Sequence, residues 1–136
     1  MTNYLTRSEL IRLNHDIRPD VPIDQLDQLV QYEPGIDIVV VQPQQIMFGQ
    51  ELYPTLWIKA AFIMQKITKK HVFTNGNKRT SLTATAYFLY KNNYDLLITD
   101  EEAVDIVLFA TNNDDSEEIM RKIARWLKEH SRKIEE

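Results

Sequence analysis

One short stretch of the chain, residues 71–82 with the sequence HVFTNGNKRTSL, combines a histidine, a turn of small residues and two adjacent cations. Residues 75–77, Asn-Gly-Asn, tolerate the positive φ angles at which successive backbone N–H groups converge on an anion. A helix that begins just after them would add its N-terminal amides and its dipole. The motif therefore predicts a phosphate site, with Lys78 and Arg79 as cations and His71 as a base that titrates near neutrality.

These residue types suit the transfer of a phosphoryl group. That reaction needs charge stabilisation, alignment and a base for the attacking hydroxyl, and little covalent help from the protein. Arg79 offers a planar fork for phosphate oxygens, whereas Lys78 acts as a point charge. Phe73 is expected to anchor the loop in the core, and Thr80 either caps the following helix or contacts phosphate. A plainer interpretation is an Asn-Gly turn at a helix start with surface cations.

The stretch resembles the Fic motif H-x-F-x-(D/E)-(G/A)-N-(G/K)-R in the form found in the death-on-curing (Doc) toxins, where Lys precedes the Arg and Thr follows it. The matching residues are His71, Phe73, Gly76, Asn77, Lys78, Arg79 and Thr80. Residues 43–56 upstream are also similar to this branch, so the resemblance covers most of residues 4–128. It implies an all-α, Fic-type helical bundle around a central helix, with a short β-hairpin flap that positions the target segment.

The resemblance also implies a set of site residues and ligands. The catalytic residues would be His71, Lys78 and Arg79, and the residues that bind ATP would be Asn75, Gly76, Asn77, Lys78, Arg79 and Thr80. A Lys at position 78 crowds the space that an α-phosphate occupies in adenylylating Fic proteins. The resemblance to the Doc branch implies transfer of the γ-phosphate to a Thr or Ser of a translation protein, elongation factor Tu, which would arrest translation.

Two positions depart from the general Fic pattern. Asn75 stands where the family usually carries the acidic residue that holds Mg²⁺, and a neutral amide oxygen is a weaker ligand for this cation. Asp114 and Asp115 are an alternative source of metal ligands. Leu82 replaces the second Arg of adenylylating members, which the Doc branch also lacks. Two alternatives stay open: a protein adenylyltransferase, and a Fic-fold binding module weakened in catalysis by Asn75.

The resemblance implies restraint by a partner, a Phd-like antitoxin. The nearest match to an internal inhibitory motif, residues 131–136, lies at a terminus expected to fray. A net charge of −4 and a pI near 5.4 give no basic field for direct nucleic-acid binding. Lys66, Lys69 and Lys70 nevertheless add to a local basic cluster around Lys78 and Arg79. The first residues lack a signal peptide and no apolar run could cross a membrane, so we expect a cytoplasmic protein.

Composition favours one globular domain over residues 1–136, with 43% hydrophobic and 26% charged residues. The chain contains no cysteine, which excludes disulfides and thiolate metal sites. The spacing of apolar residues predicts helices over 6–16, 22–33, 53–68 and 78–91, and helix starts at Thr99 and Ser116. The β-branched run 36–42 predicts a strand or half of a hairpin, and 43–52 a loop. Residues 78–91 show no polar stripe, which is typical of a central, surrounded helix.

Overall fold

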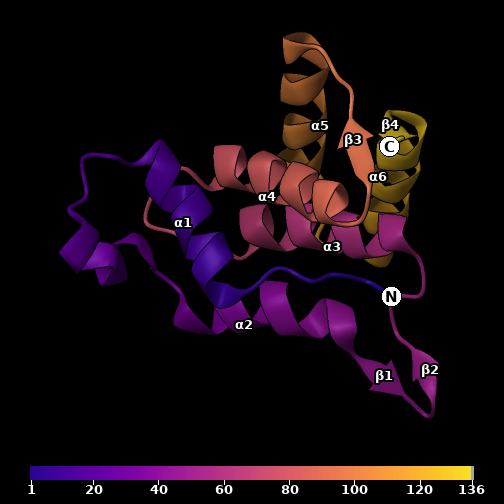
Figure 1. Cartoon of the computed structure of the whole chain (residues 1–136), viewed down its shortest axis with the longest axis horizontal. Coiled ribbons are helices and arrows are strands. Elements are labelled where there is room, and N and C mark those ends of the chain that lie inside the picture. Colours follow the sequence, from indigo (N-terminus) through magenta and orange to yellow (C-terminus); the bar gives the residue numbers. More distant parts are fainter. Residues whose placement is uncertain (136) are drawn as a thin grey trace.

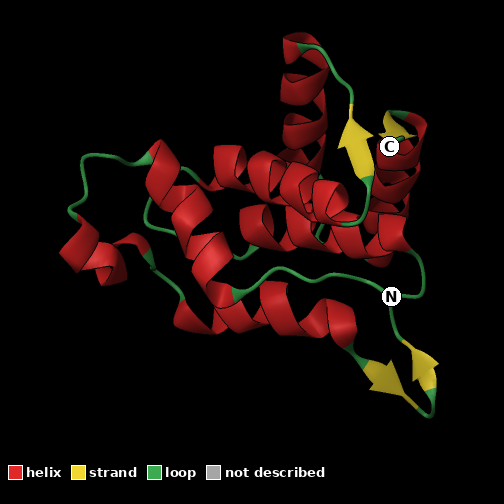
Figure 2. Cartoon of the chain, in the orientation of Figure 1, coloured by secondary structure: helices red, strands yellow, loops and turns green. Residues whose placement is uncertain are grey.

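The computed structural model describes residues 1–135 and is built mostly of helices (Figures 1 and 2). The α-helices are α1 (Arg7–Ile17), α2 (Glu33–Val41), α3 (Leu56–Lys69), α4 (Asn77–Lys91), α5 (Asp100–Asn112) and α6 (Glu117–Glu129). Two 3-10 helices, η1 (Ile23–Leu29) and η2 (Gln42–Gln44), flank α2. The strands are β1 (Ile46–Met47), β2 (Gln50–Glu51), β3 (Tyr94–Leu96) and β4 (Ser131–Lys133). The expected all-α bundle with a short hairpin is confirmed.

Helices α3 and α4 lie side by side at the centre of the bundle, and α1, α2, α5 and α6 surround them (Figure 1). The buried apolar side chains form one continuous cluster to which all six α-helices contribute. On α4 the buried positions include Thr80, Ala84, Thr85 and Phe88, which lie on more than one face. The prediction of a surrounded helix over 78–91 is therefore confirmed.

Side-chain caps set the starts of four helices. Thr6 and Thr99 form capping boxes with Glu9 and Glu102, and Thr55 and Ser116 accept a hydrogen bond from the N–H three residues later. A hydroxyl at the N-cap satisfies a backbone donor that the helix itself leaves unpaired. The helices predicted to begin at Thr6, Thr99 and Ser116 are confirmed within a residue.

Residues 22–42 differ from the prediction. Of the run predicted as a strand, 36–42, residues 36–41 lie in α2 and Gln42 begins η2, with Ile36 and Val39 buried one turn apart. A short run of apolar residues fits either period, and packing against α3 decides for the helix. The helix predicted over 22–33 is only the seven-residue η1, because the following residues extend to pair with the loop after α3.

The hairpin is formed by the residues predicted as a loop. β1 pairs antiparallel with β2 around Phe48 and Gly49, which both have positive φ angles of 53° and 77°. Two positive φ angles are what a type I′ hairpin turn requires. The buried Lys59 fixes the hairpin base by donating to the Glu51 carboxylate and the Pro43 carbonyl, both at 3.0 Å.

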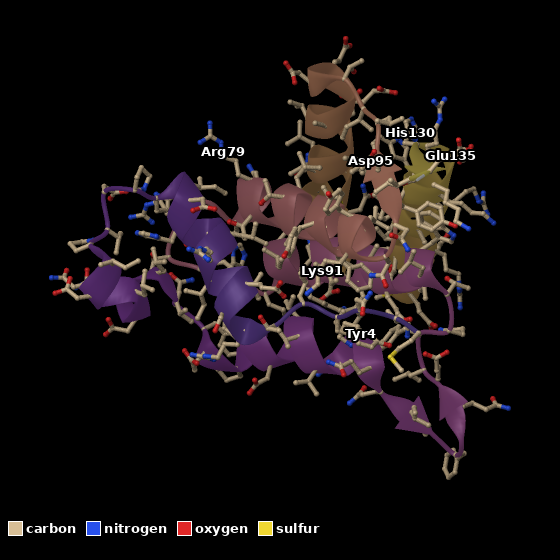
Figure 3. All side chains as sticks on the ribbon, in the orientation of Figure 1. Tyr4, Arg79, Lys91, Asp95, His130 and Glu135 are labelled. Atoms are coloured by element: carbon tan, nitrogen blue, oxygen red, sulfur yellow. The ribbon has the colours of Figure 1, made fainter. Side chains whose placement is uncertain are left out.

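This hairpin lies far from the phosphate motif. It precedes α3, whereas the motif follows α3, and 14 helical residues span about 21 Å. Figures 1 and 3 show the hairpin and Arg79 on opposite sides of the molecule. A flap that positions a target segment would have to lie at the site. The structure does not bring the hairpin there.

The last strand of the chain, β4, belongs to a second small sheet. β3 pairs antiparallel with β4, and the Ile134 N–H adds a bond to the Asn93 carbonyl at 2.8 Å. His130, at the end of α6, contacts the Trp126 carbonyl through Nδ1 and the Glu102 carboxylate through Nε2. The expectation of a frayed end is thus wrong for residues 131–133, and Glu136 lies outside the described residues.

Helix α1 is tied to the end of α4 by a half-buried carboxylate, Glu9. Lys91 Nζ donates to Glu9 at 2.6 Å and to the Tyr4 carbonyl at 3.0 Å, and the Tyr87 hydroxyl donates to Glu9 at 2.9 Å (Figure 3). Burial raises the pKa of Glu9, but hydrogen bonds from Lys91, the Thr6 backbone and Tyr87 outweigh it and lower the pKa to about 2.

We predict that Glu9→Gln makes the free energy of unfolding less dependent on pH in the acid range. Because the folded-state pKa is lowered, Glu9 stabilises the fold above its usual pKa of 4.5, and this stabilisation is lost as the pH falls to about 2. The variant and the parent should therefore differ in unfolding free energy at neutral pH and converge near the lower value. Urea titrations across this range measure the difference. Glu118→Gln, which removes an exposed pair at 3.8 Å, is the control and should change little. A constant offset for Glu9→Gln at every pH would contradict the assignment.

Candidate active site

The motif loop starts with a left-handed turn at His71. Helix α3 ends at Lys69 with Lys70 as its C-cap, and His71 follows with a φ of 48°. This is the position after the cap where helices most often place Gly, because a left-handed residue lets the chain turn away. The turn leaves His71 exposed, and its ring makes no hydrogen bond to any residue that the structure describes.

The next residues are held by the segment that precedes α2. The Gln31 and Tyr32 N–H groups both donate to the Val72 carbonyl, at 2.9 and 3.1 Å, and the Thr74 N–H donates to the Leu29 carbonyl at 2.8 Å. The Val72 and Phe73 side chains are fully buried in the core. The expected anchoring role of Phe73 is confirmed, and the loop is held on both sides of it.

Asn77 closes the loop onto α4. Its Oδ1 accepts from the Phe73 N–H and its Nδ2 donates to the Phe73 carbonyl, both at 2.9 Å. This two-way clamp uses both ends of the amide. The side chain of Asn77 therefore positions the loop, and only its backbone N–H is left for a ligand.

Helix α4 begins without a side-chain cap. Gly76 is the N-cap, with a φ of 76°, and has no side chain to accept from the first turn. The Asn75 Oδ1 accepts only from the adjacent Gly76 N–H, at 2.7 Å. The N–H groups of residues 77–79 have no carbonyl partner within the helix. They point toward the helix N-terminus, where the dipole favours an anion.

Two unpaired cations stand at this helix start. Lys78 and Arg79 are exposed, and neither makes an ion pair within residues 1–135. Arg79 points away from the bundle into solvent (Figure 3). The other lysines of the expected basic cluster all have polar partners, so the cations without an ion-pair or hydrogen-bond partner among the described residues of the cluster lie in the first turn of α4.

Asp115 forms ion pairs with two of those lysines, Lys66 and Lys70. It lies 2.6 Å from Lys66 Nζ and 3.4 Å from Lys70 Nζ, while Lys69 Nζ donates to the Thr111 carbonyl at 2.9 Å. Burial raises the pKa of Asp115, but the hydrogen bond and charge of Lys66, with a smaller contribution from Lys70, lower it below its ordinary value. Asp115 is therefore held by cations instead of being available to a metal.

A cleft of about 380 Å³ gathers these features. The motif residues that line it are His71, Thr74, Asn75, Gly76, Asn77, Lys78 and Arg79, and Thr68 and Thr111 complete the wall. The structure thus brings together six of the seven site residues expected from the sequence. The seventh, Thr80, is fully buried, faces α1 and caps no helix. Since Ser81 Oγ donates to the Lys78 carbonyl at 2.6 Å, it does not cap the helix either.

Sequence reasoning missed the residues that support the loop from outside the motif. Asn14 of α1 donates to the Asn75 carbonyl at 3.0 Å, and Gln31 Nε2 donates to the His71 carbonyl at 3.3 Å. A signal for Asn14 exists, because it interrupts the apolar stripe of α1 four residues after the buried Leu10. Gln31 lies outside any regular pattern and carries no such signal.

The described residues hold no group of three or more His, Cys, Asp or Glu side chains that could bind a metal ion. No helix among them is long and apolar enough to cross a membrane. The candidate site is a helix start with unpaired N–H groups, two exposed cations and a neighbouring histidine, placed on the helical core.

Comparison with known proteins agrees with this arrangement. The family model described as "Fic/DOC family" matches residues 4–89, and the chain belongs to this family. The chain is also similar to Toxin Doc of Mycolicibacterium smegmatis, with 39% identity over 61 residues, which supports the Doc branch. That alignment covers 45% of this chain and 47% of the relative, so the chain matches about half the length of the relative. No solved structure matches the chain.

We predict that Gly35→Ala destabilises the fold at the support of the loop. A Cβ at Gly35 would lie 2.8 Å from Val72 Cγ2 and 3.0 Å from Tyr32 Cδ2, and the short, branched side chain of Val72 is fully buried. Overpacking of this kind costs about 1–3 kcal/mol, which the better helix propensity of Ala only partly offsets. Thermal unfolding should show a lower Tm. A matched control is Gly49→Ala, which meets no atom within 4 Å and is strained only by its φ of 77°. An unchanged Tm for Gly35→Ala would show that α2 does not press on the loop.

Proposed function

We propose that the protein is a Doc-type toxin that transfers the γ-phosphate of ATP to a Ser or Thr hydroxyl of another protein. The observation that carries the proposal is the cleft in which unpaired helix N–H groups, two unpaired cations and an exposed histidine meet. Members of the Fic/DOC family are typically transferases that act on proteins and use nucleotides. An anion with a large negative charge is the ligand that this helix start suits best.

In the proposed reaction the phosphates of ATP lie against the backbone N–H groups of residues 77–79. Arg79 contacts phosphate oxygens through its guanidinium fork, and Lys78 supplies a point charge. The target hydroxyl attacks the γ-phosphorus as the bond from that phosphorus to the bridging oxygen breaks, which releases ADP. His71 accepts the hydroxyl proton. Removal of that proton by a positioned base typically contributes about 10²–10⁴ in rate.

Lys78 favours transfer of the terminal phosphate. Its side chain lines the cleft beside Gly76 and fills space at the first turn of α4. An α-phosphate placed there for adenylyl transfer would have to share that space with the lysine, whereas a terminal phosphate can approach from the open side. Adenylyl transfer is the second candidate, and the position of the label in ATP separates the two reactions.

The residues of this chain do not fit a resident magnesium site. Asn75 offers one neutral oxygen, which already accepts from the Gly76 N–H, and Asp115 is bound by lysines. Hard Mg²⁺ prefers several charged or carbonyl oxygens. Asn75 is thus at most a weak ligand, and a Mg²⁺ ion would enter with the nucleotide, whose phosphates bind it. No step assigned to the protein passes through the metal.

We further propose that the target is a translation protein, with elongation factor Tu as the first to test, and that a Phd-like antitoxin restrains the toxin in the cytoplasm. Similarity to a protein named Toxin Doc supports this pairing. A growth assay with and without the neighbouring reading frame tests it. We also propose that residues 1–136 form a single Fic/Doc domain.

The first test is label transfer with variants of His71. We expect γ-labelled ATP to label elongation factor Tu, α-labelled ATP to give no labelling, and His71→Gly to reduce transfer by about 10²–10⁴. Gly suits the left-handed φ of 48° at this position, so the variant should keep or raise the Tm. Loss of transfer with an intact fold separates a base from a histidine that only ends α3. Transfer that survives in His71→Gly would remove His71 from the mechanism.

Arg79→Ala provides the contrast to that variant, because it removes a ligand contact and leaves the base in place. It should weaken ATP binding as well as transfer, whereas His71→Gly should leave ATP affinity close to that of the parent. Arg79→Lys keeps the charge but loses the planar fork, and its affinity should fall between the two. Calorimetry with a non-hydrolysable ATP analogue measures all three.

A further prediction concerns Asn75→Asp. The carboxylate can still accept from the Gly76 N–H, so the loop geometry is kept, and it adds the charge that Mg²⁺ seeks. We expect tighter binding of Mg-ATP and faster phosphotransfer, but no gain for ATP in EDTA. The same measurement on Asp115→Asn, which frees Lys66 and Lys70, controls for a general change of charge. Equal or slower transfer by Asn75→Asp in excess Mg²⁺ would show that the amide serves the reaction better than a carboxylate.

A further inference from the structure

Asn14 is a buried polar side chain that touches the phosphate loop from outside the motif. It lies on α1 with no exposed surface, and its Nδ2 donates to two acceptors. One is the Asn75 carbonyl at 3.0 Å, just before Gly76, and the other is the Thr80 hydroxyl at 2.9 Å, one turn into α4. The amide therefore spans the point where the loop becomes the helix.

Stability alone does not account for an Asn at this position. Its Oδ1 is buried and has no hydrogen-bond partner among residues 1–135. A buried acceptor that has lost water without gaining a partner disfavours folding, and an apolar residue of similar size would avoid that cost. Rotation of the amide gives no relief, because Oδ1 would then face the Asn75 carbonyl, a second acceptor. The orientation with Nδ2 toward the loop is fixed by the Asn75 carbonyl.

Two side chains of α1, Asn14 and Ile17, also lie beside the left-handed residue of the loop. A Cβ at Gly76 would lie 3.4 Å from Asn14 Nδ2 and 3.6 Å from Ile17 Cγ2. The peptide between Asn75 and Gly76 is thus held through its carbonyl by Asn14, and α1 borders it on the side of Gly76. Its orientation sets where the free N–H groups of residues 77–79 point.

We propose that Asn14 is a positioning residue for phosphate binding, which acts through the Asn75 carbonyl and does not touch the ligand. This proposal rests on the proposed function and deepens it. Asn14 lies outside the lining of the cleft, so its effect on the ligand must be indirect. The side chain holds Gly76 in its left-handed conformation before the nucleotide arrives. Binding then requires less ordering of the loop, which is the benefit of preorganisation.

The test uses a background in which the second acceptor is removed. In Thr80→Val no buried hydroxyl is left unpaired when Asn14 is changed, and replacement of both hydrogen-bond partners by apolar groups of similar shape is close to neutral for stability. Asn14→Leu in this background deletes the loop contact and the unpartnered Oδ1 together. The comparison is between Thr80→Val and Asn14→Leu/Thr80→Val.

We expect the double variant to keep or raise the Tm of its background while its affinity for a non-hydrolysable ATP analogue falls roughly three- to tenfold, the effect of one hydrogen bond. Without any ligand, amide exchange at Phe73, whose N–H is bonded to Asn77, and at position 80, whose N–H is bonded to the Gly76 carbonyl, should speed up by a similar factor. Exchange at Phe88 and Leu89, deeper in α4, should not change.

Three results overturn the positioning role: exchange at residues 73 and 80 that stays unchanged, affinity that stays unchanged while exchange speeds up, or exchange that speeds up along all of α4 with a lower Tm. The ligand-free exchange measurement also separates this inference from the proposed function. If the parent protein binds neither the ATP analogue nor pyrophosphate, the proposed function fails, and the phosphate role of Asn14 fails with it. Local exchange still reports whether Asn14 orders the loop.

Discussion

The site depends on one constraint: the first N–H groups of α4 must be rigidly placed and yet left without partners. Thr6, Thr55, Thr99 and Ser116 satisfy the corresponding groups of their helices with a hydroxyl, whereas Gly76 offers none to α4. Unpaired donors normally make a helix end fray. Here the surroundings replace the cap, because the core holds Phe73, the Asn77 amide clamps its backbone, and Asn14 of α1 donates to the Asn75 carbonyl.

The cations near the motif differ in whether they have partners within the protein. Five cations lie near the motif in sequence. Asp115 pairs with Lys66 and Lys70, and Lys69 donates a hydrogen bond to the Thr111 carbonyl. The two that remain unpaired, Lys78 and Arg79, lie beside the free N–H groups. The single negative charge of Asp115 offsets part of the positive charge of Lys66 and Lys70, so the effective charge near the site is smaller than a count of cations indicates. A single phosphate chain suits this pattern better than an extended polyanion.

The distance of the hairpin from this site separates two parts of the Fic-like arrangement. The hairpin is present, tied to the core through the buried Lys59, yet α3 stands between it and the motif. Ile46, Met47 and Phe48 on it remain exposed. The hairpin therefore contributes nothing to the wall of the cleft, which Thr68, Thr74 and Thr111 complete. The part of the site that we propose to bind phosphate is formed without the hairpin.

The sequence by itself determined the motif, its family and most helix starts, because each depends on neighbours in the chain: the caps at Thr6, Thr99 and Ser116, the glycine before α4, and the cations after it. Only the tertiary structure decided what distant residues impose. Residues 33–41 are a helix because α3 offers them a packing surface, and 131–133 are a strand because β3 offers an unpaired edge. Asn14 donates to the carbonyl of Asn75, 61 positions away in the chain, and the buried Thr80 hydroxyl faces Asn14. These contacts form because a polar group buried away from water needs a hydrogen-bond partner within the protein.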